Sequence, residues 1–312
     1  MALLAVAVGI YLLIKGGDWL MQAAVALSLR FSIPKIVIGM TVVSFATSAP
    51  ELIISIKSAL TGHPDLALGN VVGSNIANLG FVLAITLIIS PISVSRSFYR
   101  TDWPMMILSS LLFYYFISID QKLDAFEGVV MFIILIIFII YLIKFQKRND
   151  LSEATVIEET LPIKKIMTLL TFGGFSLWLG SETLIKGAVM LAQNIGVSER
   201  IISVSIVSLG TSVPELSASI IAILNKEKAI SLGNLVGSNI FNLMAVLGLT
   251  AMIHPLSVMD QGLLNNDLWW MMGISILVLP LIFFSKKNHL AWRGGLILLI
   301  LYGIFIFPLF IK

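Results

Sequence analysis

The chain has 312 residues, of which 58% are hydrophobic and only 12% are charged. A soluble domain keeps about a quarter of its residues charged, so this composition excludes an ordinary soluble globular protein. The chain has no cysteine, which excludes disulfides and thiolate metal sites, and its formal net charge is only +3.

Ten apolar segments follow one another along the chain, and a helix needs about 20 mostly apolar residues to cross a bilayer. The first segment has no basic region before it and runs on past Lys15 and Asp18, so we expect a span and not a cleaved signal peptide. The expected spans are residues 3–28, 34–60, 66–90, 103–119, 124–145, 164–193, 198–224, 229–253, 267–284 and 290–311.

The basic residues are distributed unevenly between the two sides of this expected topology. If both termini lie outside, the inner loops hold fourteen Lys and Arg, the outer side holds three and the spans hold three, which accounts for all 20. Because cytoplasmic loops are enriched in Lys and Arg, this distribution predicts extracytoplasmic termini and a cytoplasmic central linker. We expect a multi-pass protein of the cell (plasma) membrane.

An internal repeat relates the two halves of the chain. After a shift of 164 residues, 27 of the 52 positions in 43–94 are identical to those in 207–258, without a gap. Each half holds five expected spans, an odd number, so the second half must enter the membrane from the opposite side. The sequence therefore predicts an all-α integral membrane protein with ten transmembrane helices in two inverted five-helix repeats, 1–145 and 164–312, joined by a linker at 146–163.

The segment TSAPE at 47–51 recurs as TSVPE at 211–215, in each case near the middle of a span. Proline cannot donate a backbone hydrogen bond and clashes with the carbonyl four residues earlier, so we expect free carbonyls around 46–48 and 210–212. Beside them stand Glu51 and Glu215, two carboxylates at membrane depth, where charged groups are costly and mark functional sites. Two such carboxylates could share one divalent cation, and oxygen ligands suit Ca²⁺ or Na⁺.

A second repeated element is GNVVGSNIAN at 69–78, matched by GNLVGSNIFN at 233–242. Ser74 and Asn78 are four residues apart and so share one helix face, as do Ser238 and Asn242. These side chains add neutral oxygen atoms, and the glycines allow close helix packing. Taken alone, the element is more typical of a packing helix than of an ion site; its recurrence beside a repeated Pro-Glu pair favours an ion site.

These paired motifs make the sequence resemble the cation/Ca²⁺ exchanger (CaCA) superfamily, and above all its short prokaryotic sodium/calcium antiporters. The resemblance covers nearly the whole chain. It implies that Glu51 and Glu215 hold Ca²⁺ with the carbonyls of Thr47 and Thr211. It also implies that Na⁺ uses the same glutamates with the hydroxyls of Ser48, Ser74, Ser212 and Ser238 and the carbonyls of Ser44 and Ser208, while Asn78 and Asn242 line the centre.

The sequence departs from the family pattern at two positions. Ala46 stands where the family has glycine, which affects helix packing, and Asn242 stands where some archaeal and the potassium-dependent branches carry Asp. The resemblance thus implies a secondary active antiporter that exchanges Na⁺ for Ca²⁺ by alternating access without K⁺. An H⁺/Ca²⁺ exchanger of the same fold is the alternative.

Other classes of protein fit the sequence less well. An intramembrane enzyme would need a nucleophile and a base within reach, and no histidine lies at mid-span, so we expect no enzymatic activity. A channel is disfavoured because a strong two-carboxylate site would slow a pore. We expect no cofactor, no nucleic acid and no protein partner; the expected partners are the transported Ca²⁺ and Na⁺ and the lipid bilayer.

Overall fold

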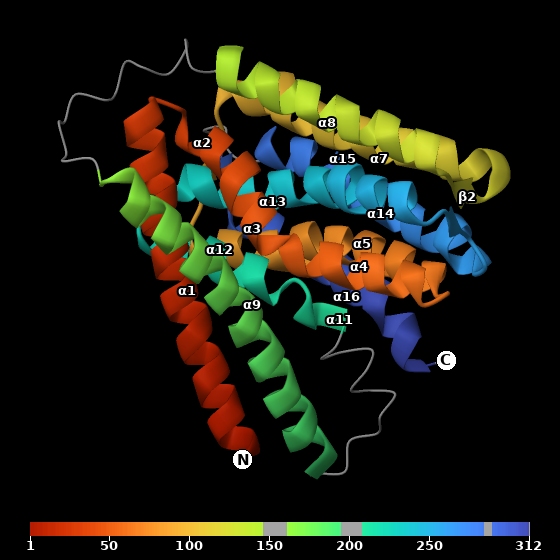
Figure 1. Cartoon of the computed structure of the whole chain (residues 1–312), viewed down its shortest axis with the longest axis horizontal. Helices are drawn as coiled ribbons and strands as arrows, with labels where there is room; N and C mark the ends of the chain where they lie inside the picture. The colour runs from red at the N-terminus through yellow and green to blue at the C-terminus, as the bar shows by residue number, and fades with distance from the viewer. Residues whose placement is uncertain (146–160, 195–207, 284–288, 312) are drawn as a thin grey trace.

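The computed structural model describes residues 1–145, 161–194, 208–283 and 289–311, and every long element in them is a helix (Figure 1). The first half contains α1 (Ala2–Phe31), α2 (Lys35–Ile38), η1 (Gly39–Val43), α3 (Ser44–Thr47), α4 (Ala49–Leu60), α5 (Pro64–Ala77), η2 (Asn78–Leu83), α6 (Ala84–Ile89), β1 (Ile92–Ser93), η3 (Phe98–Asp102), α7 (Trp103–Asp120), β2 (Lys122–Leu123) and α8 (Ala125–Phe145), where η denotes a π-helical turn.

Where it is described, the second half repeats this order of elements. It contains α9 (Ile163–Asn194), α11 (Ser208–Gly210), α12 (Val213–Leu224), α13 (Lys228–Phe241), η6 (Asn242–Leu247), α14 (Gly248–Ile253), β3 (Leu256–Ser257), η7 (Leu263–Asp267), α15 (Leu268–Phe283), β4 (His289–Leu290) and α16 (Trp292–Ile311). The expected spans coincide with these helices wherever the chain is described, and the start of the span expected at 198–224 lies outside the described residues.

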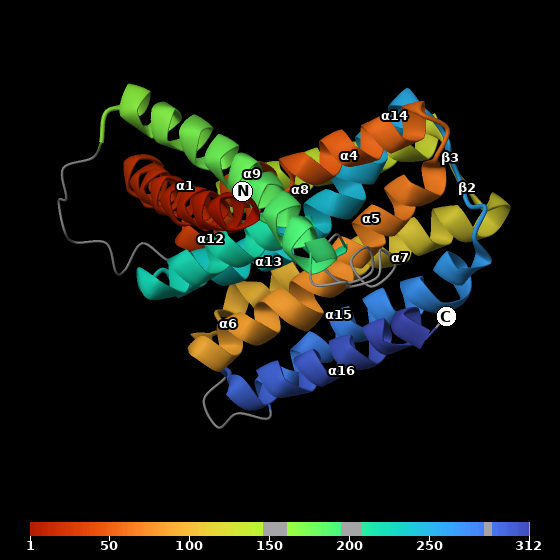
Figure 2. The ribbon, with the colours of Figure 1, turned by 90° about the horizontal axis from the view of Figure 1, so that it is seen from below.

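The corresponding helices α1 and α9 lie side by side and run in opposite directions, as Figures 1 and 2 show. Glycines bring their backbones close together: a Cβ atom on Gly180 would lie 2.9 Å from the Leu13 nitrogen, and one on Gly173 would lie 2.8 Å from the Leu20 nitrogen. Small residues allow this approach, which membrane helices use where no hydrophobic effect drives association. The opposite directions of two equivalent helices agree with an inverted repeat.

Short strands join the two halves outside this helix pair. β1 pairs antiparallel with β4, with Ile92 opposite Leu290, and β2 pairs antiparallel with β3, with Lys122 opposite Ser257. In both cases a strand of one half hydrogen-bonds to a strand of the other. The remaining helices are thereby tied together across the repeat boundary.

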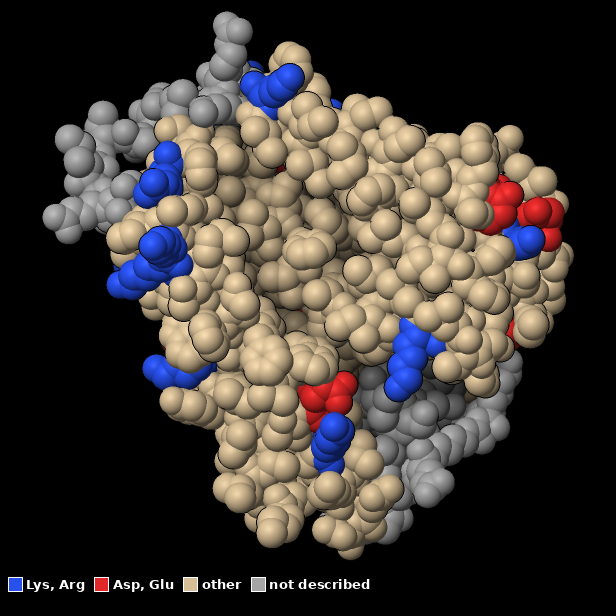
Figure 3. All heavy atoms as spheres, in the orientation of Figure 1, with Lys and Arg blue, Asp and Glu red and all other residues tan. Residues whose placement is uncertain are grey.

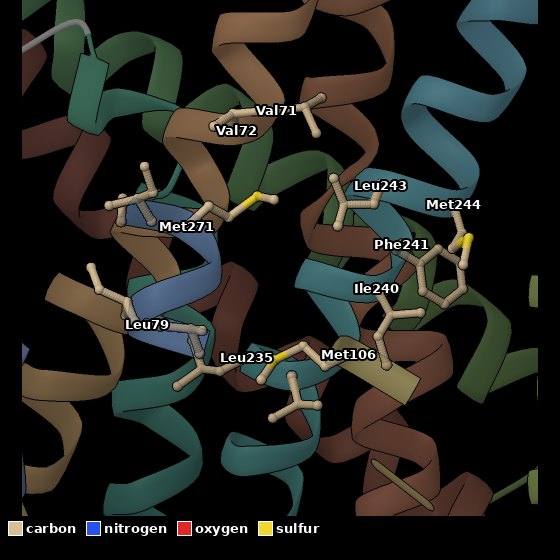
Figure 4. Packing of buried hydrophobic residues seen from close by; sticks show 14 of the residues in the cluster. Val71, Val72, Leu79, Met106, Leu235, Ile240, Phe241, Leu243, Met244 and Met271 are labelled. Atoms are coloured by element: carbon tan, nitrogen blue, oxygen red, sulfur yellow. The ribbon is translucent and has the colours of Figure 1, made fainter. Parts of the chain in front are cut away.

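A large buried cluster fills the space where these remaining helices meet (Figure 4). Both halves contribute to it, so neither half could bury its apolar surface in this way alone. Among its members are Val71, Val72, Leu79 and Met106 from the first half and Leu235, Ile240, Phe241, Leu243, Met244 and Met271 from the second.

Six helices of the described chain are long and apolar enough to cross a membrane, or seven if the bent pair Lys35–Thr47 and Ala49–Leu60 is one span. Two shorter apolar helices, Val213–Leu224 and Trp292–Pro308, add to these. Length and apolarity therefore establish a helical membrane protein without confirming the expected count of ten. Figure 3 shows several Lys and Arg along the upper and left edges of the visible face, with a few others elsewhere, and most of this face is uncharged.

Candidate functional site

Each repeat has a helix break within its TSxPE segment, at Ser48 in the first repeat and at Thr211 and Ser212 in the second. α3 ends at Thr47 and α4 begins at Ala49, with a bend of 45° between the two stretches. The intervening Ser48 has φ −89° and ψ 4°, and Ser212 has nearly the same angles, φ −86° and ψ 2°. The prolines lie in the first turn of the following helix, where the missing N–H does no harm. The sequence thus produces the same break twice.

The carbonyls around these breaks are less free than the sequence predicted. Hydrogen bonding resumes at the serines, because Leu52 N donates to Ser48 O at 3.2 Å and Leu216 N donates to Ser212 O at 3.0 Å. The Gly210 carbonyl accepts a hydrogen bond of 2.9 Å from Ser181 Oγ on α9. The expectation of free carbonyls is therefore wrong at Ser48, Gly210 and Ser212.

The two expected carboxylates lie in the first turns of α4 and α12, and both are fully buried. When both are ionised, their like charges repel each other. Ser48 Oγ donates to Glu215 Oε1 at 3.2 Å, whereas both oxygens of Glu51 lack a hydrogen-bond partner among the described residues. No Lys or Arg in the described ranges pairs with either group; the ion pairs found there are Lys35–Glu227 and Lys186–Glu182. Buried charge of this kind requires compensation.

The hydroxyls expected at the site meet across the repeat boundary. Ser74 Oγ lies 3.0 Å from Thr211 Oγ1, and Ser238 Oγ lies 3.3 Å from Thr47 Oγ1. The GSN element of each half thus contacts the TSxPE element of the other. Thr47 Oγ1 also donates to Asn234 Oδ1 at 3.2 Å.

The outermost pair of expected ligands is described on one side only. Ser44 is buried, and its Oγ donates to Gly39 O at 2.8 Å and to Asn234 O at 3.0 Å. Its hydroxyl is therefore engaged in joining the two halves, which is compatible with the expectation that its carbonyl is the ligand. Ser208 begins α11, and its side chain lies outside the described part of the chain.

The two central asparagines, Asn78 and Asn242, are fully buried, and each begins a π-helical turn, η2 and η6. Such turns displace backbone groups from regular pairing and occur often at functional sites. Asn242 Nδ2 donates to Asn75 Oδ1 at 3.0 Å, whereas neither polar atom of the Asn78 side chain has a partner among the described residues.

Three asparagines that the sequence did not single out support the site. Asn75 Nδ2 donates to Asn239 O at 3.1 Å, and Asn239 Nδ2 donates to Asn75 O at 3.2 Å, so these residues join the two repeats directly. Asn234 accepts from Thr47, as described above. All three lie in the repeated GNxxGSN element. Asn234 stands four residues before Ser238 on the same helix face, so the spacing could have identified it, whereas Asn75 and Asn239 lie off that face.

An apolar pocket of about 300 Å³ borders the site at Ser48. Helix α8 forms one of its walls and contributes Phe132 and Leu135, while Phe241 comes from α13. Among the described residues that line the pocket, Ser48 has the only polar side chain, so the pocket lacks the oxygen ligands that a hard cation needs. The cation-binding chemistry lies instead among the carboxylates, hydroxyls and amides between the repeats.

The arrangement offers two carboxylates and many neutral oxygens, and the described part of the chain has no group of three or more His, Cys, Asp or Glu side chains that could hold a metal ion. This donor set suits Na⁺ or Ca²⁺ and lacks the nitrogen and sulfur ligands of a transition-metal site.

Comparison with known proteins identifies the family. The family model described as sodium/calcium exchanger protein matches residues 1–144 and 165–311. The chain is 35% identical to CaxA of Alkalimonas amylolytica, over 96% of this chain and 95% of that one. It is 28% identical to the sodium/calcium exchanger MaX1 of Methanosarcina acetivorans, over 97% and 96%. The solved structure of the sodium-calcium exchanger NCX_Mj superposes with a TM-score of 0.82, at 27% identity and 97% coverage of both chains. The chain belongs to the sodium/calcium exchanger protein family.

Proposed function

We propose that this protein is a secondary active antiporter that exchanges Na⁺ for Ca²⁺ across the plasma membrane by alternating access, without K⁺. The observation that carries the proposal is the pair of fully buried carboxylates, Glu51 and Glu215, which no described Lys or Arg neutralises. One Ca²⁺ balances both charges, and at least two Na⁺ are needed to do the same. The two ions then compete for the same ligands.

In this proposal, the glutamates and the Thr47 and Thr211 carbonyls bind Ca²⁺. Sodium uses the same glutamates with further oxygens from the symmetry-related serines and asparagines. Because Na⁺ and Ca²⁺ share these glutamates, their transport is coupled. The protein changes conformation only when bound cations neutralise the two carboxylates, since bare carboxylates are costly in a low-dielectric barrier. The amide of Asn242 leaves no third carboxylate at the centre for K⁺. The Na⁺ set comprises the side chains of Ser48, Ser74, Ser212, Ser238, Asn78 and Asn242 and the carbonyls of Ser44 and Ser208.

The test is ⁴⁵Ca²⁺ uptake into proteoliposomes loaded with Na⁺, measured with and without K⁺, and with a proton gradient in place of the Na⁺ gradient. We expect uptake that requires internal Na⁺, is unchanged by K⁺ and is not driven by protons. Protein-free liposomes and the Glu51→Gln variant are the controls. Uptake that strictly requires K⁺, or that a proton gradient drives equally well, contradicts the proposal.

The proposed topology has ten spans in repeats 1–145 and 164–312, termini outside and the linker 146–163 in the cytoplasm. Because the chain has no cysteine, single cysteines can report it without background. In intact cells, an impermeant maleimide should label Lys312→Cys and spare Ser152→Cys until the cells are broken open. The reverse pattern contradicts the orientation, and labelling of both contradicts the span count.

A further inference from the structure

Two asparagines related by the repeat form reciprocal hydrogen bonds between the two halves. Asn75 and Asn239 each donate from the side-chain amide to the backbone carbonyl of the other, at 3.1 Å and 3.2 Å. Both side chains are buried. These two bonds are equivalent under the repeat, so they lie at the pseudo-symmetry axis that relates the two halves.

The remaining hydrogen bonds of the same side chains break this symmetry. Asn242 Nδ2 donates to Asn75 Oδ1 at 3.0 Å. The equivalent bond would run from Asn78 Nδ2 to Asn239 Oδ1, and both of these buried atoms lack a partner among the described residues. Asn242 Oδ1 also lacks a partner, so the difference lies in the amide nitrogen, which is paired in one half and unpaired in the other. An unpaired buried donor is costly.

The carboxylates show the same one-sided pattern. Ser48 Oγ donates to Glu215 Oε1 at 3.2 Å. In the equivalent place, Ser212 Oγ and both Glu51 oxygens are buried and unpaired within the described chain. The backbone angles of Ser48 and Ser212 agree to within a few degrees, so the local fold at the two breaks does not cause the difference. It reflects how the two repeats are placed against each other.

We infer that Asn75 and Asn239 are positioning residues that hold the central amides Asn242 and Asn78 in alternation. In the present conformation Asn242 is fixed by Asn75. In the conformation open to the opposite face, Asn78 donates to Asn239 and Asn242 releases Asn75. The inference rests on the proposed alternating access, in which inverted repeats exchange their conformations. It adds a bistable pair of hydrogen bonds that gives each state one paired amide nitrogen.

The prediction specific to this switch is that loss of Asn75 and loss of Asn239 have opposite effects. Asn75→Ala removes the acceptor used in the present conformation, and Asn239→Ala removes the acceptor used in the opposite one. Each change should alter the balance of the two conformations about two- to tenfold, the effect of one net hydrogen bond. Because apparent affinity scales with the population of the competent state, the Ca²⁺ affinities at the two faces should move in opposite directions.

The experiment measures Na⁺-driven ⁴⁵Ca²⁺ exchange in right-side-out and inside-out membrane vesicles and takes the ratio of the apparent Ca²⁺ affinities at the two faces. We expect Asn75→Ala and Asn239→Ala to shift this ratio in opposite directions, and the double variant to restore it to within about twofold. Matched controls are Ser55→Ala and Ser219→Ala, since Ser55 and Ser219 accept equivalent hydrogen bonds of 3.3 Å from Asn70 and Asn234 in both halves. These controls should leave the ratio unchanged.

Shifts in the same direction, or none, in a chain with wild-type exchange would overturn the switch and leave the antiport intact. A wild-type chain without Na⁺-driven Ca²⁺ exchange would overturn the proposed function and the switch together. If the alanine variants fail to insert, Asn75→Ser and Asn239→Ser keep a polar side chain too short to reach the partner, and the same opposite shifts are expected.

Discussion

The two repeats make matching hydrogen bonds around the rim of the candidate site and different ones at its centre. At the rim, Asn70 and Asn234 donate to Ser55 and Ser219 at the same distance, 3.3 Å. At the centre, Glu215 has a serine donor in Ser48, whereas Glu51 has no partner in the described chain. Because the polar residues of the two sets of motifs are identical, the difference must come from the relative placement of the halves. The matching hydrogen bonds follow from the repeated sequence, and the differing hydrogen bonds depend on the conformation.

The largest expected effect comes from removing either carboxylate. We expect Glu51→Gln and Glu215→Gln each to lower Na⁺-driven Ca²⁺ flux at least about 100-fold. Each change removes one carboxylate partner of the bound cation, and breaking a buried pair of opposite charges costs about 3–5 kcal/mol. Although the two groups differ in hydrogen bonding, both are needed to neutralise one divalent ion. The measurement is ⁴⁵Ca²⁺ uptake in proteoliposomes containing equal amounts of inserted protein.

The control for this comparison is Glu182→Gln. Glu182 is partly exposed on α9 and lies 3.4 Å from Lys186, so unlike the two site carboxylates it is neither fully buried nor without a basic partner. Its loss should therefore leave the flux near the wild-type value. Flux near the wild-type value in either site variant would contradict the shared site.

Much of the fold follows from the sequence, because periodic apolar segments and a gapless repeat report directly on helices and on their relationship. The helix breaks at Ser48 and Ser212 were predictable from proline chemistry. The groups that hydrogen-bond to the carbonyls at these breaks were not predictable. Gly210 O is satisfied by Ser181, which lies 29 residues away on another helix, and the residue equivalent to Ser181 in the first half is Gly17, which has no hydroxyl. No local pattern encodes such a contact.

The centre of the candidate site was predictable only in part. The spacing of Ser74 and Asn78 identified one helix face, and the structure places that face against the other repeat. The roles of Asn75 and Asn239 depend instead on contact between halves, and on π-helical turns that begin at Asn78 and Asn242. A π-helical turn shifts the register of the helix after it, so the regular spacing rule fails beyond it.

The next largest effect concerns the close packing between the repeats. A Cβ atom on Gly237 would lie 2.5 Å from Met40 Cα and would also meet the Ser44 hydroxyl. We expect Gly237→Ala to lower the free energy of unfolding by about 1–3 kcal/mol, because overpacking here displaces backbone. Thermal unfolding in detergent measures the effect. The matched control is Gly273→Ala on α15, where a Cβ meets no described atom within 4 Å. Equal effects of the two changes would contradict the assigned packing.

A smaller effect sharpens the comparison at the carboxylates. Ser48→Ala removes a donor from Glu215 in the present conformation, whereas Ser212→Ala removes no hydrogen bond formed within the described chain. We expect Ser48→Ala to lower the free energy of unfolding by about 1 kcal/mol, and Ser212→Ala to lower it by much less. Thermal unfolding without Ca²⁺ or Na⁺ provides the measurement. Equal losses would mean that the asymmetry at the centre has no energetic consequence.

The smallest expected effect belongs to an ion pair at one end of the molecule. Lys35 Nζ at the start of α2 lies 2.7 Å from Glu227 Oε1, just before α13, and so joins the two halves. After the shift of 164 residues, the equivalent positions are Glu199, outside the described residues, and His63. The repeat therefore places no lysine–glutamate pair at the equivalent positions, so the two ends of the molecule are not chemically equivalent. Lys35 remains 41% exposed, so water and salt screen the attraction.

A double-mutant cycle with Lys35→Met and Glu227→Gln isolates the interaction. We expect a coupling energy of about 0.5–1 kcal/mol that decreases at high salt. This energy is of the same order as one central hydrogen bond, but the repeat supplies no second lysine–glutamate pair to replace it in the opposite conformation. It can therefore bias the balance between conformations, whereas alternation requires matched contacts such as those of Asn75 and Asn239. A coupling energy above about 3 kcal/mol would contradict this role, since only a desolvated ion pair reaches that strength. Such a pair would hold the present conformation and would have to break in every transport cycle.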